Sequence, residues 1–268
     1  MQHSFANFLE KNYSTQKASV QSYIHNDQKV WLKKAAKRHA TWMYLPLQWI
    51  AKFFGLEMLT PVPNRGGIAA VQCEIQRIQT LHELGIRTPE ILATREDAFL
   101  MLDAAASGAN VIQLEFALKN QQDSTQKMQL YKSAIEAIRD IHNKKAYLSE
   151  AFARNILVDE ALNFSFIDFE TDPGLVHSLE SCFSRDWLSF IFSTARYFNA
   201  EEFHDVSNLL TQALKQEKQS YQDVCRFSEK LSWILKFKPE KLGNDGERLK
   251  KCIYLLSNIR ENPLSTSA

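Results

Sequence analysis

Hydrophobic and polar positions follow different periods in the two halves of the chain. In the first half, short apolar runs bounded by turn residues predict β-strands over 20–24, 30–32, 89–94 and 98–103. Apolar residues that recur every three or four positions predict a helix over 68–84, and Gly85 supplies a stop signal after it. Residues 1–20 fit either a short helix or a loosely docked arm.

Beyond residue 104 the pattern is mainly helical. The exception is 147–170, where apolar runs at 156–158 and 164–169 flank a polar turn and predict a β-hairpin. Ser184 is the expected N-cap of the second predicted helix. Helical periodicity predicts five helices, over 130–142, 184–198, 200–219, 220–237 and 244–259.

The order of these elements sets the fold class. Strands with one helix come first, and helices around one hairpin follow, which predicts an α+β fold of two lobes. The N-lobe is expected to span 1–103 and the C-lobe 104–268, with the small residues of 104–110 as a hinge. A length of 268 residues suits a small lobe joined to a larger one.

Charge and cysteine content narrow the function classes. The 32 Lys and Arg residues nearly balance the 31 Asp and Glu residues, so no nucleic-acid partner is expected. The 4 cysteines lie far apart without a CxxC pair, which argues against a zinc site or disulfide framework and favours reduced thiols in the cytoplasm. The first residues lack a basic region followed by an apolar core, so no signal peptide is indicated.

The segment 42–59 is rich in aromatic and aliphatic residues. Pro46, Lys52 and Glu57 interrupt it too often for a membrane span. Two interpretations stay open. It is either a core or interlobe helix, or an interfacial membrane helix beside the basic run 34–38, which would contact anionic lipid.

The predicted hairpin carries the chemistry. Asn155 stands just before its first strand and Asp168 near the end of its second, and a hairpin places its two outer ends side by side. An amide and a carboxylate at one point suit a hard divalent cation such as Mg²⁺, with phosphate oxygens completing the shell. A third oxygen group, Glu150, lies five positions before Asn155.

These residues resemble the protein-kinase-like superfamily. Lys33 closes a Val-Trp-Leu-Lys strand and Glu74 lies on the next well-patterned helix, similar to the paired lysine and glutamate of that superfamily. Glu150 and Asn155 resemble its catalytic-loop acid and Asn. Asp168, in Ile-Asp-Phe-Glu, resembles the metal-binding Asp of Asp-Phe-Gly, thirteen positions after Asn155.

Two further positions extend the resemblance over roughly residues 20 to 200. His142 matches the His that ends the helix before the catalytic loop, and Asp186 matches the Asp that steadies this loop. The resemblance implies a two-lobed protein-kinase-like fold that uses ATP and Mg²⁺. It implies these roles: phosphate binding by Lys33, orientation of Lys33 by Glu74, metal binding by Asn155 and Asp168, acceptor activation by Glu150, and structural support by His142 and Asp186.

Within the superfamily, the chain looks most like the bacterial lipopolysaccharide-kinase group, the WaaP, Kdo-kinase and InaA-like proteins. The long insert between Lys33 and Glu74, the Gly-Ile-Arg-Thr-Pro-Glu segment at 85–90 and the lack of glycine in 19–30 carry this likeness. It implies a peripheral protein on the cytoplasmic face of a Gram-negative inner membrane. The acceptor would be a sugar hydroxyl of a lipid-linked glycan, and 42–59 would contact the bilayer.

Two alternatives to an active kinase stay open. Leu148 and Glu150 replace the usual His and Asp of the catalytic loop, so a pseudokinase that binds nucleotide or a partner without efficient phosphoryl transfer fits as well. A plain interaction protein that docks through its helical half is the third interpretation, and the metal-binding residues argue against it.

Overall fold

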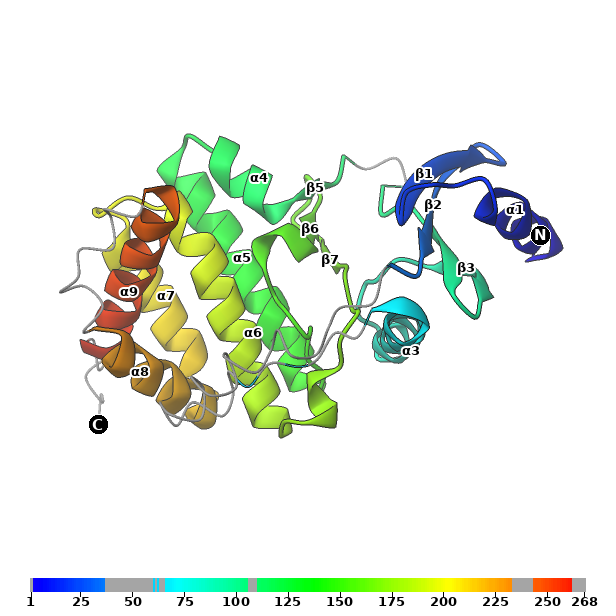
Figure 1. Cartoon of the computed structure of the whole chain (residues 1–268). Helices are drawn as coiled ribbons and strands as arrows, with labels where there is room; N and C mark the ends of the chain where they lie inside the picture. The colour runs from blue at the N-terminus through cyan, green and yellow to red at the C-terminus, as the bar shows by residue number, and fades with distance from the viewer. Residues whose placement is uncertain are drawn as a thin grey trace.

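The computed structural model describes residues 2–36, 60, 62, 66–105, 110–232 and 243–261. It shows a small lobe with the N-terminus and a larger, mainly helical lobe with the C-terminus (Figure 1). This arrangement confirms the predicted α+β fold of two lobes. The predicted segment 42–59 lies outside the described residues, as does 106–109 of the predicted hinge.

The small lobe is built on a four-stranded antiparallel sheet. The predicted strands are confirmed with small shifts at their ends, and the sheet order is β1-β2-β4-β3. At the β1–β2 turn, Asn26 and Asp27 take positive φ angles of 51° and 58°, which Asn and Asp tolerate better than other side chains. The four strands are β1 (Val20–His25), β2 (Gln28–Lys34), β3 (Ile91–Arg95) and β4 (Ala98–Leu102).

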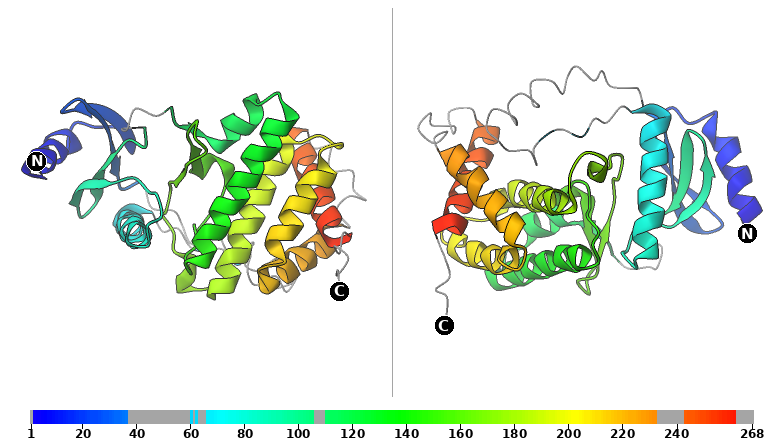
Figure 2. Two further views of the ribbon diagram at one scale, coloured as in Figure 1. Left: turned by 180° about the vertical axis from the view of Figure 1, so that it is seen from behind. Right: turned by 90° about the horizontal axis from the view of Figure 1, so that it is seen from below.

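Two helices cover opposite faces of this sheet. Helix α1 (Gln2–Tyr13) packs Phe5 and Leu9 against one face, which settles the open choice for residues 1–20 in favour of a docked helix. Helix α3 (Gly67–Glu83) lies on the other face, between the sheet and the large lobe (Figure 2). It ends at Glu83, two residues before the predicted stop signal Gly85, whose φ of +67° suits glycine.

The large lobe contains most of the predicted helices and two elements that the sequence pattern missed. The missed ones, strand β5 (Ile112–Gln113) and helix α4 (Leu114–Asn120), are too short for a clear period. Single-turn 3₁₀ helices cover Ala153–Asn155, Pro173–Leu175 and Ala195–Tyr197. The longer helices are α5 (Ser124–Asn143), α6 (Leu179–Thr194), α7 (Phe203–Leu214), α8 (Lys218–Ser232) and α9 (Asn244–Glu261).

The prediction of Ser184 as an N-cap was wrong. Helix α6 begins five residues earlier, at Leu179, and the side chain of Ser178 accepts a hydrogen bond from the backbone of Ser181. The first turn of α6 contains the polar residues Glu180 and Ser181, so the apolar pattern is weaker there than further along the helix. Ser184 is buried there and donates to the carboxylate of Asp223 on α8 at 2.8 Å.

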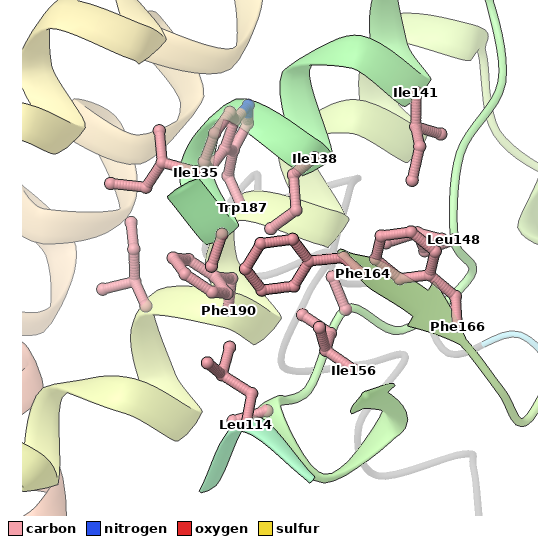
Figure 3. Packing of buried hydrophobic residues seen from close by; sticks show 14 of the residues in the cluster. Leu114, Ile135, Ile138, Ile141, Leu148, Ile156, Phe164, Phe166, Trp187 and Phe190 are labelled. Atoms are coloured by element: carbon pink, nitrogen blue, oxygen red, sulfur yellow. The ribbon is translucent and has the colours of Figure 1, made fainter. Parts of the chain in front are cut away.

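The predicted hairpin is confirmed as β6 (Ile156–Val158) and β7 (Phe164–Phe166), to which β5 adds a third strand. Ile156 pairs with Phe166, and both side chains point into the core between α5 and α6 (Figure 3). Burying such a side chain stabilises the fold by roughly 1.5–3 kcal/mol. The core of the large lobe thus holds the hairpin in place, and this fixes the positions of the residues at its two ends.

Among the described residues, no helix is long and apolar enough to cross a bilayer.

Candidate functional site

A cleft of about 580 Å³ lies between the sheet of the small lobe and the hairpin of the large lobe. Lys33, Glu74, Asn155 and Asp168 line one end of this cleft, and Glu170 contacts Lys33 there. We call these five residues the charged end of the cleft. Side chains alternate between the two faces of strand β2. Because Val30 and Leu32 face α1, Lys33 faces the cleft on the opposite side of the sheet. The structure thus brings together the four residues that the sequence predicted for nucleotide and metal binding.

Lys33 is surrounded by carboxylates. Its Nζ lies 2.6 Å from Oε2 of Glu74, on the buried face of α3. It also lies 2.9 Å from Oε1 of Glu170 and 3.6 Å from Oδ1 of Asp168. The contact with Glu170 was not predicted. The Ile-Asp-Phe-Glu motif contained the signal, because residue 170 follows the predicted metal ligand by two positions.

These contacts shift the pKa values at the charged end. Burial alone lowers the pKa of Lys33, but the charges of Glu74 and Glu170 outweigh it, so the net shift is upward. Burial raises the pKa of Glu74 to about 7; Lys33 opposes this shift, while Asp168 and Glu170 add to it. One ammonium group facing three carboxylates leaves an excess of negative charge, which favours binding of a cation.

Asn155 and Asp168 are held at the two ends of the hairpin. The backbone N–H of Ile167 donates to the carbonyl of Asn155 at 3.0 Å, which continues the strand pairing toward the cleft. Asp168 has a φ of 72°, in the left-handed region that Asp tolerates better than most side chains, and the fully buried Phe169 fixes the chain beside it.

The donor set at this point fits magnesium. The Nδ2 of Asn155 donates to the carbonyl of Glu150 at 3.3 Å, which leaves the amide oxygen for a cation. No cluster of three His, Cys, Asp or Glu side chains forms a self-sufficient metal site in the described part of the chain. Magnesium does not need one, since it commonly binds through one or two protein oxygens with phosphate oxygens and water.

Glu150 lies on the loop between α5 and the hairpin. Burial raises the pKa of its carboxyl group, and the charge of Asp168 adds to the shift, while Arg185 and Arg154 oppose it. The neighbouring Ser149 has a strained φ of 77°. Leu148, which stands where the related loops have His, is buried in the core of the large lobe (Figure 3).

His142 and Asp186 lie beneath this loop. The Oδ2 of Asp186 accepts from the backbone N–H of Leu148 at 2.6 Å and lies 3.3 Å from Nε2 of His142. The other ring nitrogen of His142 contacts Glu217 at 2.9 Å. Glu217 was missed, because it lies in the short connection between α7 and α8 and no local pattern links it to a loop seventy residues earlier.

Burial alone lowers the pKa of His142, but its hydrogen bonds to Asp186 and Glu217 raise it above the usual value. Trp187 and Ser220 also donate to Glu217, at 2.9 and 3.0 Å. We call His142, Asp186 and Glu217 the support cluster. These contacts connect the loop at 148–150 to α5, to α6 and to the residue before α8.

A sheet lobe with a Lys–Glu pair therefore faces a helical lobe with an Asn–Asp hairpin, in the predicted order along the chain. The fold is protein-kinase-like.

No protein-family model matches the chain, and no curated protein matches it. Among solved structures, it is similar to the Rio2 kinase–ADP/Mg²⁺–phosphoaspartate complex from Chaetomium thermophilum. The sequence identity is 16% and the TM-score 0.41, and the match covers 80% of this chain and 72% of that chain.

Proposed function

We propose that the protein is a phosphotransferase that uses Mg-ATP to phosphorylate a hydroxyl group. The observation that carries this proposal is the convergence of Lys33, Glu74, Asn155 and Asp168 in one cleft. An ammonium group held by a buried carboxylate suits the α- and β-phosphates of a nucleotide. Catalysis of phosphoryl transfer depends mainly on such positioning and on neutralisation of charge.

Asn155 and Asp168 would hold the magnesium ion. When bound, the ion would neutralise charge on the phosphates. Lys33 would release part of its contact with Asp168 and Glu170 and turn to the phosphates. Glu74 would keep the ammonium in place during this exchange, because it is nearly fully buried on α3.

Glu150 would orient or deprotonate the acceptor hydroxyl. Its raised pKa supports this role, because a carboxylate with a pKa nearer to neutrality is a better general base. For the acceptor we propose a sugar hydroxyl of a lipopolysaccharide-type glycan or another small molecule, on the strength of the sequence resemblance alone. The same resemblance supports a place on the cytoplasmic face of the inner membrane.

A pseudokinase is the second candidate, and one contact favours it. The carboxylate of Glu170 lies 2.9 Å from Nζ of Lys33 and occupies the ammonium that the phosphates would need. In that case the cleft would still bind a nucleotide or a partner, but phosphoryl transfer would be slow.

A thermal-shift series with ATP, with and without Mg²⁺, tests the nucleotide site. We expect ATP with Mg²⁺ to raise the melting temperature of the wild type. Lys33→Ala should abolish the shift. Lys34→Ala is the matched control, because the neighbouring lysine faces away and donates to the carbonyls of Tyr13 and Gln16. No shift in the wild type would rule out the kinase and the pseudokinase that binds nucleotide.

Turnover separates the two candidates. With lipopolysaccharide core oligosaccharide as acceptor, the kinase should release ADP in an acceptor-dependent way, and Glu150→Gln should lower the rate by about 100-fold. Glu160→Gln, on the exposed turn of the hairpin, should leave the rate unchanged. Nucleotide binding without turnover, not restored by Glu150→Asp, would favour the pseudokinase.

A further inference from the structure

The cleft has a second, apolar end beyond Lys33. The sheet of the small lobe forms one wall of this end, and the hairpin of the large lobe forms the other. Because β2 alternates, Trp31 projects into the cleft two residues before Lys33, and it pairs across the sheet with Met101. Leu157 and Ile167 lie on the opposite wall. A flat apolar group next to the phosphate-binding end would fit between these walls.

The indole of Trp31 is held in one orientation. Its Nε1 donates to Oδ2 of Asp103 at 2.5 Å, and Nζ of Lys29 lies 5.0 Å from the ring centroid. Lys29 also forms an ion pair with Asp103 at 3.1 Å. Trp31 is half-buried, so part of its surface remains exposed to the cleft. A fixed aromatic ring beside a charged site is suited to stacking on a base.

Three backbone donors in and next to the described part of the connection between the lobes are used internally. The N–H of Leu102 donates to Glu90, and that of Asp103 donates to Lys29, both at 2.9 Å. The N–H of Ala105 donates to Oδ1 of Asp103, also at 2.9 Å. These three donors are therefore not offered to the edge of a base, where hydrogen bonds would distinguish one base from another.

From these contacts we infer that Trp31 binds the base by stacking, so that the cleft accepts nucleoside triphosphates with different bases. This inference rests on the proposed nucleotide site. Stacking tolerates any base, because every base has a π-face. A site that reads base edges would leave polar groups unpaired with the wrong base and would discriminate strongly.

Dissociation constants of the full-length protein test the inference, with four probes: Mg-ATP, Mg-GTP, Mg-CTP and Mg-tripolyphosphate. We expect the three nucleotides to bind within about fivefold of one another. Trp31→Ala should weaken each of them by about tenfold and leave tripolyphosphate unchanged. Trp31→Phe keeps a ring and should retain most of the affinity. Tyr23→Ala, an aromatic residue that contacts Phe8 of α1, is the control that should change none of the four.

The outcomes separate the two proposals. A preference above about 50-fold for one base would overturn the inference. So would unchanged or tighter nucleotide binding by Trp31→Ala, which would mean that the indole fills the base position. In either case tripolyphosphate still binds and the phosphate site stands. If neither nucleotides nor tripolyphosphate bind the wild type, the proposed function fails and the inference fails with it.

Discussion

Two charged clusters in this molecule are built from similar side chains but differ in exposure. The support cluster joins His142 to the carboxylates of Asp186 and Glu217, whose side chains are 0% and 17% exposed. The charged end of the cleft joins Lys33 to three carboxylates. Two of these, Asp168 and Glu170, have side chains that are 42% and 32% exposed.

The difference separates a structural cluster from a binding site. In the support cluster the donors come from the protein itself, because a backbone N–H, an indole and a hydroxyl all point at the two carboxylates. At the charged end, one ammonium group faces three carboxylates and two of these reach solvent. Such an excess of charge costs stability unless a ligand neutralises it. The first cluster should therefore control folding and the second should control binding.

The largest effect is expected from Asp186→Ala in the support cluster. The substitution leaves Nε2 of His142 buried without its partner and removes the acceptor of the Leu148 N–H. Loss of one partner from a buried charged network costs about 3–5 kcal/mol. Urea denaturation should show this loss in the free energy of unfolding. Glu229→Ala, on an exposed position of α8, should change it by less than about 0.5 kcal/mol. An equally small change in Asp186→Ala would contradict the structural role.

Asp168→Asn should have the opposite profile. The variant removes one excess negative charge, so the free protein should unfold at the same temperature as the wild type or higher. It should lose the stabilisation by Mg-ATP, which for the wild type is about 2.7 kcal/mol at a ligand concentration of 100 times the Kd. Thermal unfolding with and without ligand measures both effects. If the free variant were less stable than the wild type and Mg-ATP still stabilised it, Asp168 would support the fold and not bind the ligand.

Glu74→Gln should reveal the raised pKa of Glu74. The folded-state pKa of about 7 exceeds the ordinary value of 4.5, so between these values the folded protein binds more protons than the unfolded one. The wild type should therefore lose stability relative to Glu74→Gln as the pH rises from 5 to 7, by at most about 1 kcal/mol per pH unit. The difference in unfolding free energy, measured by urea titration at each pH, checks the sign.

The control for this experiment is Glu136→Gln, on an exposed position of α5. The difference in unfolding free energy between this variant and the wild type should stay constant over the same pH range. If the Glu74→Gln difference were also flat, or rose in favour of the wild type, the carboxylate would not be held in the buried position described above.

The smallest effect is expected from Glu170→Gln. This half-exposed ion pair is worth at most about 1 kcal/mol. Freeing Lys33 from it should tighten Mg-ATP binding up to about fivefold. Titration calorimetry can resolve this change. Weaker binding by the variant would indicate that Glu170 assists the metal or the nucleotide and does not compete for Lys33.

Local patterns predicted most of the fold and the charged end of the cleft. The hairpin could be found because β-branched and aromatic runs flank a polar turn, and its two ends follow from the geometry of any hairpin. Lys33 was found from the resemblance of Val-Trp-Leu-Lys to a strand motif of the superfamily, and Glu74 from its place on the next well-patterned helix. Glu217 could not be predicted in this way, because its contact with His142 arises from packing between distant segments. The contact of Glu170 with Lys33 was missed although Glu170 stands in the same motif as Asp168. The domain boundary at 103/104 and the roles of the site residues stay predictions.

The most direct test of the central claim is the Kd of the wild type and Asp168→Asn for ATP, by titration calorimetry in Mg²⁺ and in EDTA. The account predicts that Mg²⁺ tightens binding to the wild type by tenfold or more, on the order of 1.4 kcal/mol. Binding to Asp168→Asn should be weak and independent of Mg²⁺. Equal Mg²⁺ dependence in the two proteins, or ATP binding to neither, would show that the charged end of the cleft is not a magnesium–nucleotide site.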